Sequence, residues 1–214
     1  MKHSFYCILA GSVALILFLT LPGVTCAQEK TVPVEPSEER LNNQHKPEEL
    51  MDAMGLKEGM VIADVGAGRG RLTVFFASRV GDNGLVMAND IDKNALEYLE
   101  NRCEKNHITN VETFLGTTVD PGLPEDRADI IFLVSTYHHL EKPVELIRNT
   151  IPALKPDGRL VIVERDPVKT GQASSESTKQ EVLISQVSEA GYELVKINTE
   201  LLARDNVYFF RIGR

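Results

Sequence analysis

The sequence predicts an α/β fold in which helices cover both faces of a mostly parallel β-sheet. Short apolar runs alternate with stretches of helical periodicity from about residue 47 to residue 165, the pattern of repeated strand–helix–strand units. Residues 128–134 form the most apolar of these runs, as a central parallel strand should. Two strand-like runs with no helix between them end the chain, which indicates an antiparallel hairpin.

The expected elements follow in a regular order, and several carry start or stop signals. Pro47 suits the first turn of a helix, Asp92 is a good N-cap, and Gly191 suits a helix end. Helices are expected over residues 47–54, 72–80, 93–106, 144–154 and 177–190. Strands are expected over residues 60–65, 85–88, 111–115, 128–134, 160–164, 192–197 and 206–212.

Residues 1–27 have the parts of a targeting segment. Lys2 precedes an apolar run over residues 5–21, and small residues precede Gln28. A cleaved signal peptide and a membrane anchor both fit this pattern. The positive charge before the apolar run favours export, to a periplasm or to the outside, although an anchor with the domain facing the cytoplasm stays open. Residues 28–45 are polar and indicate a linker or a loosely ordered arm, which leaves residues 46–214 as one domain.

Charge and cysteine content argue against several classes of partner. The chain of 214 residues has a formal net charge of −8 and no cluster of Lys and Arg, so a nucleic-acid partner is not expected. Cys103 is the only cysteine beyond the targeting segment, so neither an internal disulfide nor a paired-cysteine zinc site can form. No metal site is expected, and the oligomeric state is left open.

A glycine-rich loop carries the strongest functional signal. Gly66, Gly68 and Gly70 lie directly after the strand expected over residues 60–65 and directly before a helix, where backbone can approach a ligand closely. Asp90, which ends the next strand, stands where an acidic residue often takes ribose hydroxyls. The combination predicts a nucleotide-cofactor site. Arg71 occupies the third small position of a dinucleotide loop, which argues against NAD, FAD and an oxidoreductase.

These motifs resemble those of the class I S-adenosylmethionine (SAM)-dependent methyltransferases, from about Pro47 to the C-terminus. Asp64 and the loop up to Gly70 match the first motif of that family, and Asp90 matches the second. Residues 123–129 and 154–160 are also similar to family segments. The resemblance implies a Rossmann-like sheet of seven strands with a C-terminal antiparallel hairpin, and SAM as the cofactor.

The resemblance also implies roles for individual residues. The backbone of Gly66, Ala67, Gly68 and Gly70 would hold the methionine end of SAM, with Asp64 near its ammonium group. Asp90 would accept hydrogen bonds from the ribose, and Ile91 would lie against the adenine. The family often has Gly-Asp after the third strand, whereas here Gly116 is followed by Thr117, which could accept one hydrogen bond from the adenine.

The methyl acceptor is expected beyond the fourth and fifth strands. Tyr137, His138 and His139 follow the apolar run 128–134 and are expected to line the acceptor pocket, and either histidine could act as a base. Capping or simple solvation of the histidines is the alternative. Glu164, Arg165 and Asp166 stand at the end of the next strand and either contact the acceptor or simply end that strand.

The sequence therefore predicts a methyltransferase. A small molecule or a lipid or quinone-like compound is the expected acceptor, and a protein acceptor stays open. Membrane association through the N-terminus is a further possibility. The alternative function is a SAM- or nucleoside-binding protein without catalysis.

Overall fold

A computed structural model of the chain describes residues 32–171 and 177–213, so the targeting segment expected over residues 1–27 lies outside the described part. Seven strands form one sheet in the order β3-β2-β1-β4-β5-β7-β6. All neighbours are parallel except β7, which is antiparallel to β5 and to β6, so the predicted fold and terminal hairpin are confirmed. The strands are β1 (Val61–Val65), β2 (Leu85–Asp90), β3 (Val111–Leu115), β4 (Ala128–Val134), β5 (Leu154–Arg165), β6 (Tyr192–Asn198) and β7 (Asp205–Ile212).

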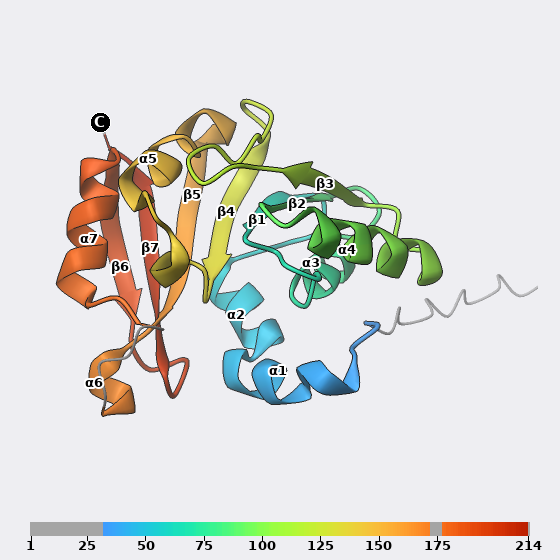
Figure 1. Cartoon of the computed structure of the whole chain (residues 1–214), viewed down its shortest axis with the longest axis horizontal. Helices are drawn as coiled ribbons and strands as arrows, with labels where there is room; N and C mark the ends of the chain where they lie inside the picture. The colour runs from blue at the N-terminus through green and yellow to red at the C-terminus, as the bar shows by residue number, and fades with distance from the viewer. Residues whose placement is uncertain (1–31, 172–176, 214) are drawn as a thin grey trace, which may run out of the picture. The chain divides into compact units, whose positions relative to one another are not determined.

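Helices lie on both faces of this sheet (Figure 1). Helices α2, α3 and α4 pack on one face, and α5 and α7 pack side by side on the other. None of the helices in the described ranges combines the length and the apolar character needed to cross a bilayer. The α-helices are α1 (Glu39–His45), α2 (Pro47–Met54), α3 (Thr73–Val80), α4 (Lys93–Lys105), α5 (Pro143–Arg148), α6 (Pro167–Thr170) and α7 (Gln180–Glu189), and the 3-10 helices are η1 (Pro36–Glu38), η2 (Tyr137–His139) and η3 (Ile151–Ala153).

Local signals place most elements where the sequence predicts them. β4 is almost wholly buried, because helices cover both of its faces. The side chain of Asp92 accepts a hydrogen bond from the backbone N–H of Asn94, as an N-cap should. Phe76 of α3 meets Phe132 of β4 edge to face at 5.1 Å between ring centroids, which fixes one helix against the sheet centre.

The helix predicted over residues 144–154 is shorter than expected. α5 ends at Arg148, η3 contains Pro152, and β5 already begins at Leu154. A proline cannot donate the backbone hydrogen bond that would continue the helix. Leu154 pairs instead with Ala128 at the start of β4, so the residue predicted to end the helix belongs to the sheet.

The linker predicted over residues 28–45 is wrong for residues 36–45, which form η1 and α1. Glu38 and Arg102 of α4 make a buried ion pair, with both carboxylate oxygens 2.8 Å from guanidinium nitrogens. Arg102 also donates to the backbone carbonyl of Pro33 at 2.7 Å. A polar segment can be ordered when its charges find buried partners elsewhere in the fold, which composition alone does not reveal.

Candidate active site

At the centre of the glycine loop after β1, backbone atoms are open to a ligand because no side chain covers them. Gly66, Gly68 and Gly70 have φ angles of +79°, +55° and +79°, which glycine adopts without strain. A Cβ at Gly66 would overlap the side chain of Thr136, and one at Gly70 would overlap Leu99. At Gly68 a Cβ would have no heavy atom within 4 Å. The outer glycines therefore allow close packing, while Gly68 faces open space that a ligand can use.

A first cavity of about 330 Å³, the donor cavity, lies beside this loop at the carboxyl end of β2. Asp90 and Ile91 line it, and the Ile91 side chain is 61% exposed. The two carboxylate oxygens of Asp90 accept hydrogen bonds from the backbone N–H groups of Gly68, at 2.7 Å, and of Asp92, at 2.9 Å. Each oxygen keeps a lone pair for a further donor. The cavity thus offers an acidic group and an apolar surface at adjacent positions.

Thr117 also lines the donor cavity, but its hydroxyl group is occupied. It accepts hydrogen bonds from the backbone N–H groups of Val119 and Asp120, at 3.3 and 3.0 Å. A hydrogen bond from an adenine amino group would compete with these contacts. The sequence reasoning missed Asn89, whose amide donates to the carbonyl oxygens of Phe114 and Pro121 and so holds the β3 side of the cavity.

A second cavity of about 370 Å³, the acceptor-side cavity, adjoins the first. Gly66, Ser135 and His139 line both cavities, which together form one cleft across the carboxyl ends of β1 and β4. Ligands of open α/β sheets bind at this edge. Ser135 has a φ of +50° at the shared wall, an uncommon conformation that no sequence signal marked.

Asp64 lines the acceptor-side cavity from the end of β1. Its carboxylate accepts a hydrogen bond from the Thr73 hydroxyl at 2.7 Å. Burial raises the pKa of Asp64 to about 6, although the Thr73 hydrogen bond and the positive charge of Arg71 act in the opposite direction. The side chain is therefore negatively charged above about pH 6, as contact with an ammonium group requires.

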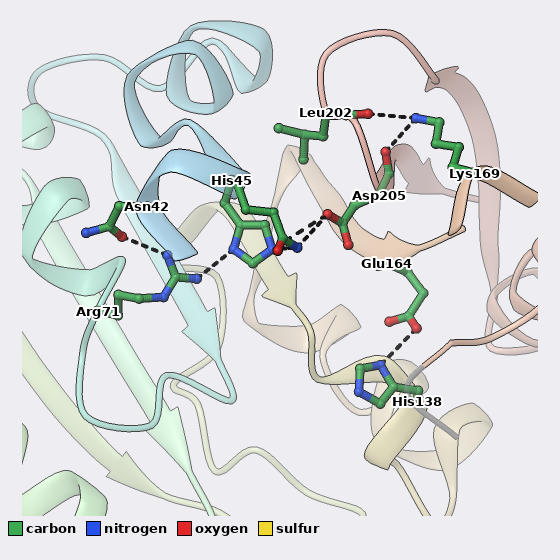
Figure 2. A network of polar contacts seen from close by, with 9 residues as sticks. Asn42, His45, Arg71, His138, Glu164, Lys169, Leu202 and Asp205 are labelled. Carbon is green, nitrogen blue, oxygen red and sulfur yellow. Dashed lines mark hydrogen bonds and ion pairs between the residues drawn. The ribbon is translucent and has the colours of Figure 1, made fainter. Parts of the chain in front are cut away.

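His138 and Glu164 form a buried pair beside the same cavity (Figure 2). His138 Nδ1 lies 2.8 Å from Glu164 Oε1, and the two side chains are 6% and 0% exposed. Glu164 Oε1 also accepts from the backbone N–H of Thr178, while Oε2 has no hydrogen-bond partner in the described ranges. An ionised carboxylate only accepts hydrogen bonds, so it places the proton on Nδ1 and leaves the Nε2 lone pair available.

The other two residues of this predicted group, Tyr137 and His139, lie in different environments. His139 lines both cavities, with its ring centroid 4.1 Å from that of His138. Tyr137 instead lies in the core, where its hydroxyl donates to Gln186 Oε1 at 3.0 Å and burial raises its pKa. The predicted position of Tyr137 in the acceptor pocket is wrong, because successive side chains of a 3-10 turn point about 120° apart.

Helix α1 completes the cleft with residues that the sequence reasoning assigned to a linker. Arg40, Leu41 and His45 line the acceptor-side cavity. Arg71 donates to Asn42 Oδ1 at 2.9 Å and lies 2.8 Å from His45 Nδ1, which ties α1 to the glycine loop (Figure 2). In the sequence, Arg71 served only as an argument against a dinucleotide cofactor. In the structure, its side chain links α1 to the glycine loop.

His45 is held in its neutral form. Burial, and then the charges of Arg71 and Arg165, lower its pKa to about 3. Because the Arg71 guanidinium can only donate, His45 Nδ1 must accept and carries no proton. Asp205 Oδ2 lies 3.8 Å from Nε2, a weak contact that does not offset these effects.

Acid should destabilise the protein through His45. The folded-state pKa lies below the ordinary value of 6.5, so the folded state binds fewer protons and its stability falls as pH drops from 6.5 towards 3. This group alone should cost about 2 kcal/mol of unfolding free energy between pH 7 and pH 5. The raised pKa of Asp64 acts in the opposite sense between about pH 4 and pH 6.

A His45→Gln variant isolates this contribution, because Gln can still accept from Arg71 while Asp64 is unchanged. Urea unfolding of both proteins at pH 7 and pH 5 should show that the free energy of unfolding falls less for the variant than for the wild type. An equal fall in both proteins would show that His45 does not cause the loss of stability in acid.

The described ranges contain no group of three or more His, Cys, Asp or Glu side chains arranged to hold a metal ion. Carboxylates, histidines and arginines line the cleft together with apolar side chains such as Leu41, Leu72 and Leu146.

The sheet order, with a cleft at the carboxyl ends of β1 and β4, is that of a Rossmann-like fold. Residues 56–204 match the family described as "Methyltransferase domain", and the chain belongs to that family. The chain therefore contains a methyltransferase domain, and SAM-dependent methyltransferases are among the proteins that share its fold.

Solved structures share the fold. A SAM-dependent methyltransferase from Aquifex aeolicus superposes with a TM-score of 0.75 at 24% identity, covering 83% of this chain and 94% of that one. A geranyl diphosphate C-methyltransferase from Streptomyces coelicolor A3(2), in complex with Mg²⁺, geranyl diphosphate and S-adenosyl-L-homocysteine, gives 0.65 at 16% identity and covers 81% of each chain.

Curated relatives match part of the chain. A ubiquinone/menaquinone biosynthesis C-methyltransferase, UbiE, from Vibrio parahaemolyticus is 30% identical over 115 residues, which is 53% of this chain and 44% of the relative. The matched region thus spans less than half the length of that relative.

Proposed function

We propose that the protein transfers the methyl group of SAM to a small organic acceptor that loses a proton to His138. One observation carries the proposal: the His138–Glu164 pair lies at the wall of a cavity that adjoins the donor cavity. A histidine whose ring is oriented by a buried carboxylate is suited to accept a proton at its other nitrogen. The pair therefore favours catalysis.

The glycine loop and the cleft formed by the two cavities fit SAM by their chemistry. The open backbone at Gly68 suits the methionine end, with Ala67 and the other loop glycines around it. Asp64 supplies a negative charge for the ammonium group. Asp90 can accept from ribose hydroxyls, and the exposed Ile91 can cover the adenine. Thr117 is a weaker candidate for the adenine amino group, because its hydroxyl already holds its own loop.

SAM supplies a methyl group that its sulfonium already activates. The chain therefore has to orient the acceptor and, where the acceptor carries a proton, to remove it. Glu164 orients the ring of His138 and stabilises it once it is protonated. His138 Nε2 then receives the proton from the acceptor oxygen, nitrogen or carbon as that atom bonds to the methyl group. His139 lines the passage between the cavities.

The named relatives support a small acceptor of quinone or isoprenoid type. The curated relative named above is a quinone-biosynthesis C-methyltransferase, and one structural neighbour is a C-methyltransferase of geranyl diphosphate. The match to the quinone-biosynthesis enzyme covers about half of this chain, and the match to the geranyl diphosphate enzyme concerns the fold alone. Neither match identifies the acceptor of this protein. A proton-releasing acceptor is the part of this chemistry that the His138–Glu164 pair supports.

Two measurements test the proposal. Calorimetric titration of the purified protein should show one SAM site per chain. Incubation with SAM and a metabolite extract should release S-adenosylhomocysteine above the rate with SAM alone. Binding without release across broad extracts would favour the non-catalytic alternative, and absence of SAM binding would overturn the assignment of the donor cavity.

A further inference from the structure

The segment before α2 forms an arm beside the acceptor-side cavity. This arm comprises residues 33–45, which include η1 and α1, and α1 lies at the edge of the sheet where the parallel strands end (Figure 1). Arg40, Leu41 and His45 of α1 line the acceptor-side cavity, so the arm is one wall of that cavity. A movement of the arm would therefore open the cavity.

Two arginines join the arm to the donor side of the cleft. Arg71 directly follows the glycine loop and donates to Asn42 Oδ1 of α1 at 2.9 Å (Figure 2). Arg102 of α4 forms the buried ion pair with Glu38 of η1. The same guanidinium group donates to the backbone carbonyl of Arg69, within the glycine loop, at 3.2 Å. The position of the loop and the position of the arm are therefore fixed by the same two side chains.

A separate contact joins the arm to the far side of the same cavity. Gln44 Nε2 donates to Asp205 Oδ2 at 3.0 Å, and Asp205 is the first residue of β7. Lys169 of α6 donates to the carbonyl oxygens of Leu202 and Asp205, both at 2.8 Å, which fixes the turn that carries this carboxylate (Figure 2). The arm thus reaches from the glycine loop to β7.

Polar contacts, rather than apolar packing, hold the arm in place. None of the hydrophobic core clusters in the described ranges contains a residue of η1 or α1. The docked arm also buries two groups, Asn42 Nδ2 and Arg102 Nε, that have no hydrogen-bond partner in those ranges, which reduces the net gain from docking. Segments with little apolar burial open locally at a small fraction of the free energy of global unfolding. The arm can therefore undock while the sheet stays folded.

We infer that docking of the arm is coupled to donor binding: SAM at the glycine loop favours the docked arm, and undocking opens the acceptor-side cavity to acceptor and product. The coupling passes through Arg71 and Arg102, because a ligand that orders the glycine loop also keeps these two arginines in place for the arm. By linkage, the docked arm raises the affinity for SAM by the same factor as SAM favours docking.

The docked arm also has a task in the reaction. It covers one side of the cavity in which the methyl group is transferred, so it keeps water away from the acceptor until the product leaves. The inference rests on the proposed function, because it requires SAM to bind at the glycine loop.

The first test measures hydrogen exchange of the backbone amides of residues 36–45 in the full chain, with and without S-adenosylhomocysteine. Bound ligand should slow this exchange about threefold or more, because it lowers the population of the undocked arm. Unchanged exchange in a protein that calorimetry shows to be saturated would overturn the inference and leave the proposed function standing. Absence of calorimetric binding would contradict the proposed function, and the inference with it.

The second test uses Gln44→Ala, with Asn43→Ala as the matched control. Gln44 lines neither cavity and holds the arm at β7, away from the glycine loop. Its replacement should speed the exchange of the α1 amides about 10-fold, the effect of losing one hydrogen bond to a charged group. It should also raise the calorimetric Kd for S-adenosylhomocysteine about three- to tenfold, because a smaller fraction of the protein has the arm docked. Asn43 is the exposed neighbour on the same helix, and its replacement should change neither quantity.

The Kd separates coupling from a purely structural role of Gln44. A variant that is only less stable still has almost all of its molecules folded, and it binds the ligand with an unchanged Kd. Faster α1 exchange with an unchanged Kd would therefore overturn the coupling, and unchanged exchange would overturn the role of the Gln44–Asp205 contact in holding the arm. If Gln44→Ala does not fold, the exchange measurement on the wild-type protein still decides.

Discussion

Replacing His138 with glutamine is expected to lower kcat for methyl transfer by about 100- to 10,000-fold, the usual contribution of a general base. The glutamine amide can still donate to Glu164 Oε1, so the buried carboxylate keeps a partner. What the variant loses is the basic Nε2. The measurement is S-adenosylhomocysteine release at saturating SAM and acceptor, together with the calorimetric Kd for SAM, which should be unchanged.

His139→Gln is the matched control, because it changes the same residue type at the adjacent position on the wall of both cavities. It should lower kcat much less, since no carboxylate holds the His139 ring among the described contacts. The His138→Gln rate should also rise steadily with pH, as the acceptor loses its proton to water instead. Equal losses in both variants, or a parallel loss of SAM binding, would contradict the role of His138 as the base.

Replacing Asp90 with alanine is expected to raise the Kd for SAM by about 10- to 100-fold, the loss that corresponds to one or two hydrogen bonds to a charged group. The carboxylate has two tasks. It is placed to accept from the ribose, and it already accepts from the Gly68 N–H, so it also holds the centre of the glycine loop. Calorimetric titration with SAM and with S-adenosylhomocysteine measures the effect.

Asp92→Ala is the control for this variant. Asp92 is an exposed acid two positions after Asp90, and its side chain caps α4 by accepting from the N–H of Asn94. Its loss should cost about 1 kcal/mol of stability and leave the Kd for SAM unchanged. Comparable Kd changes in the two variants would mean that general loop disorder, and not the Asp90 carboxylate, sets the affinity.

Most of the fold could be predicted because its signals are local. The run over residues 128–134 is apolar along its whole length, and it becomes the buried central strand β4. Asp92 before a helical pattern becomes an N-cap. The prediction was wrong where a distant partner decides the conformation: residues 36–45 became helical beside a buried ion pair with Arg102, and Leu154 joined the sheet by pairing with Ala128.

The residues of the candidate site also fall into those that the sequence could predict and those that it could not. The glycine loop and Asp90 were identifiable because the strand, turn and acid follow one another at short spacing, and the structure places them together at one cavity. Tyr137 was misplaced because the sequence does not show which way a single turn directs its side chains. Thr117 was placed at the cavity, but the use of its hydroxyl within its own loop was not foreseen.

By itself the sequence determined the class of fold, the order of its strands and the glycine-rich loop with its downstream acid, since each depends on periodicity or on residues within a few positions of one another. Only the tertiary structure decided which residues share the acceptor-side cavity. His138 meets Glu164 across 26 positions, and Arg71 meets His45 across the same separation. Arg40 and Arg165 are brought to that cavity from α1 and β5. Contacts between such distant residues depend on strand order and helix packing. Because these are properties of the whole fold, no short segment of sequence encodes the contacts.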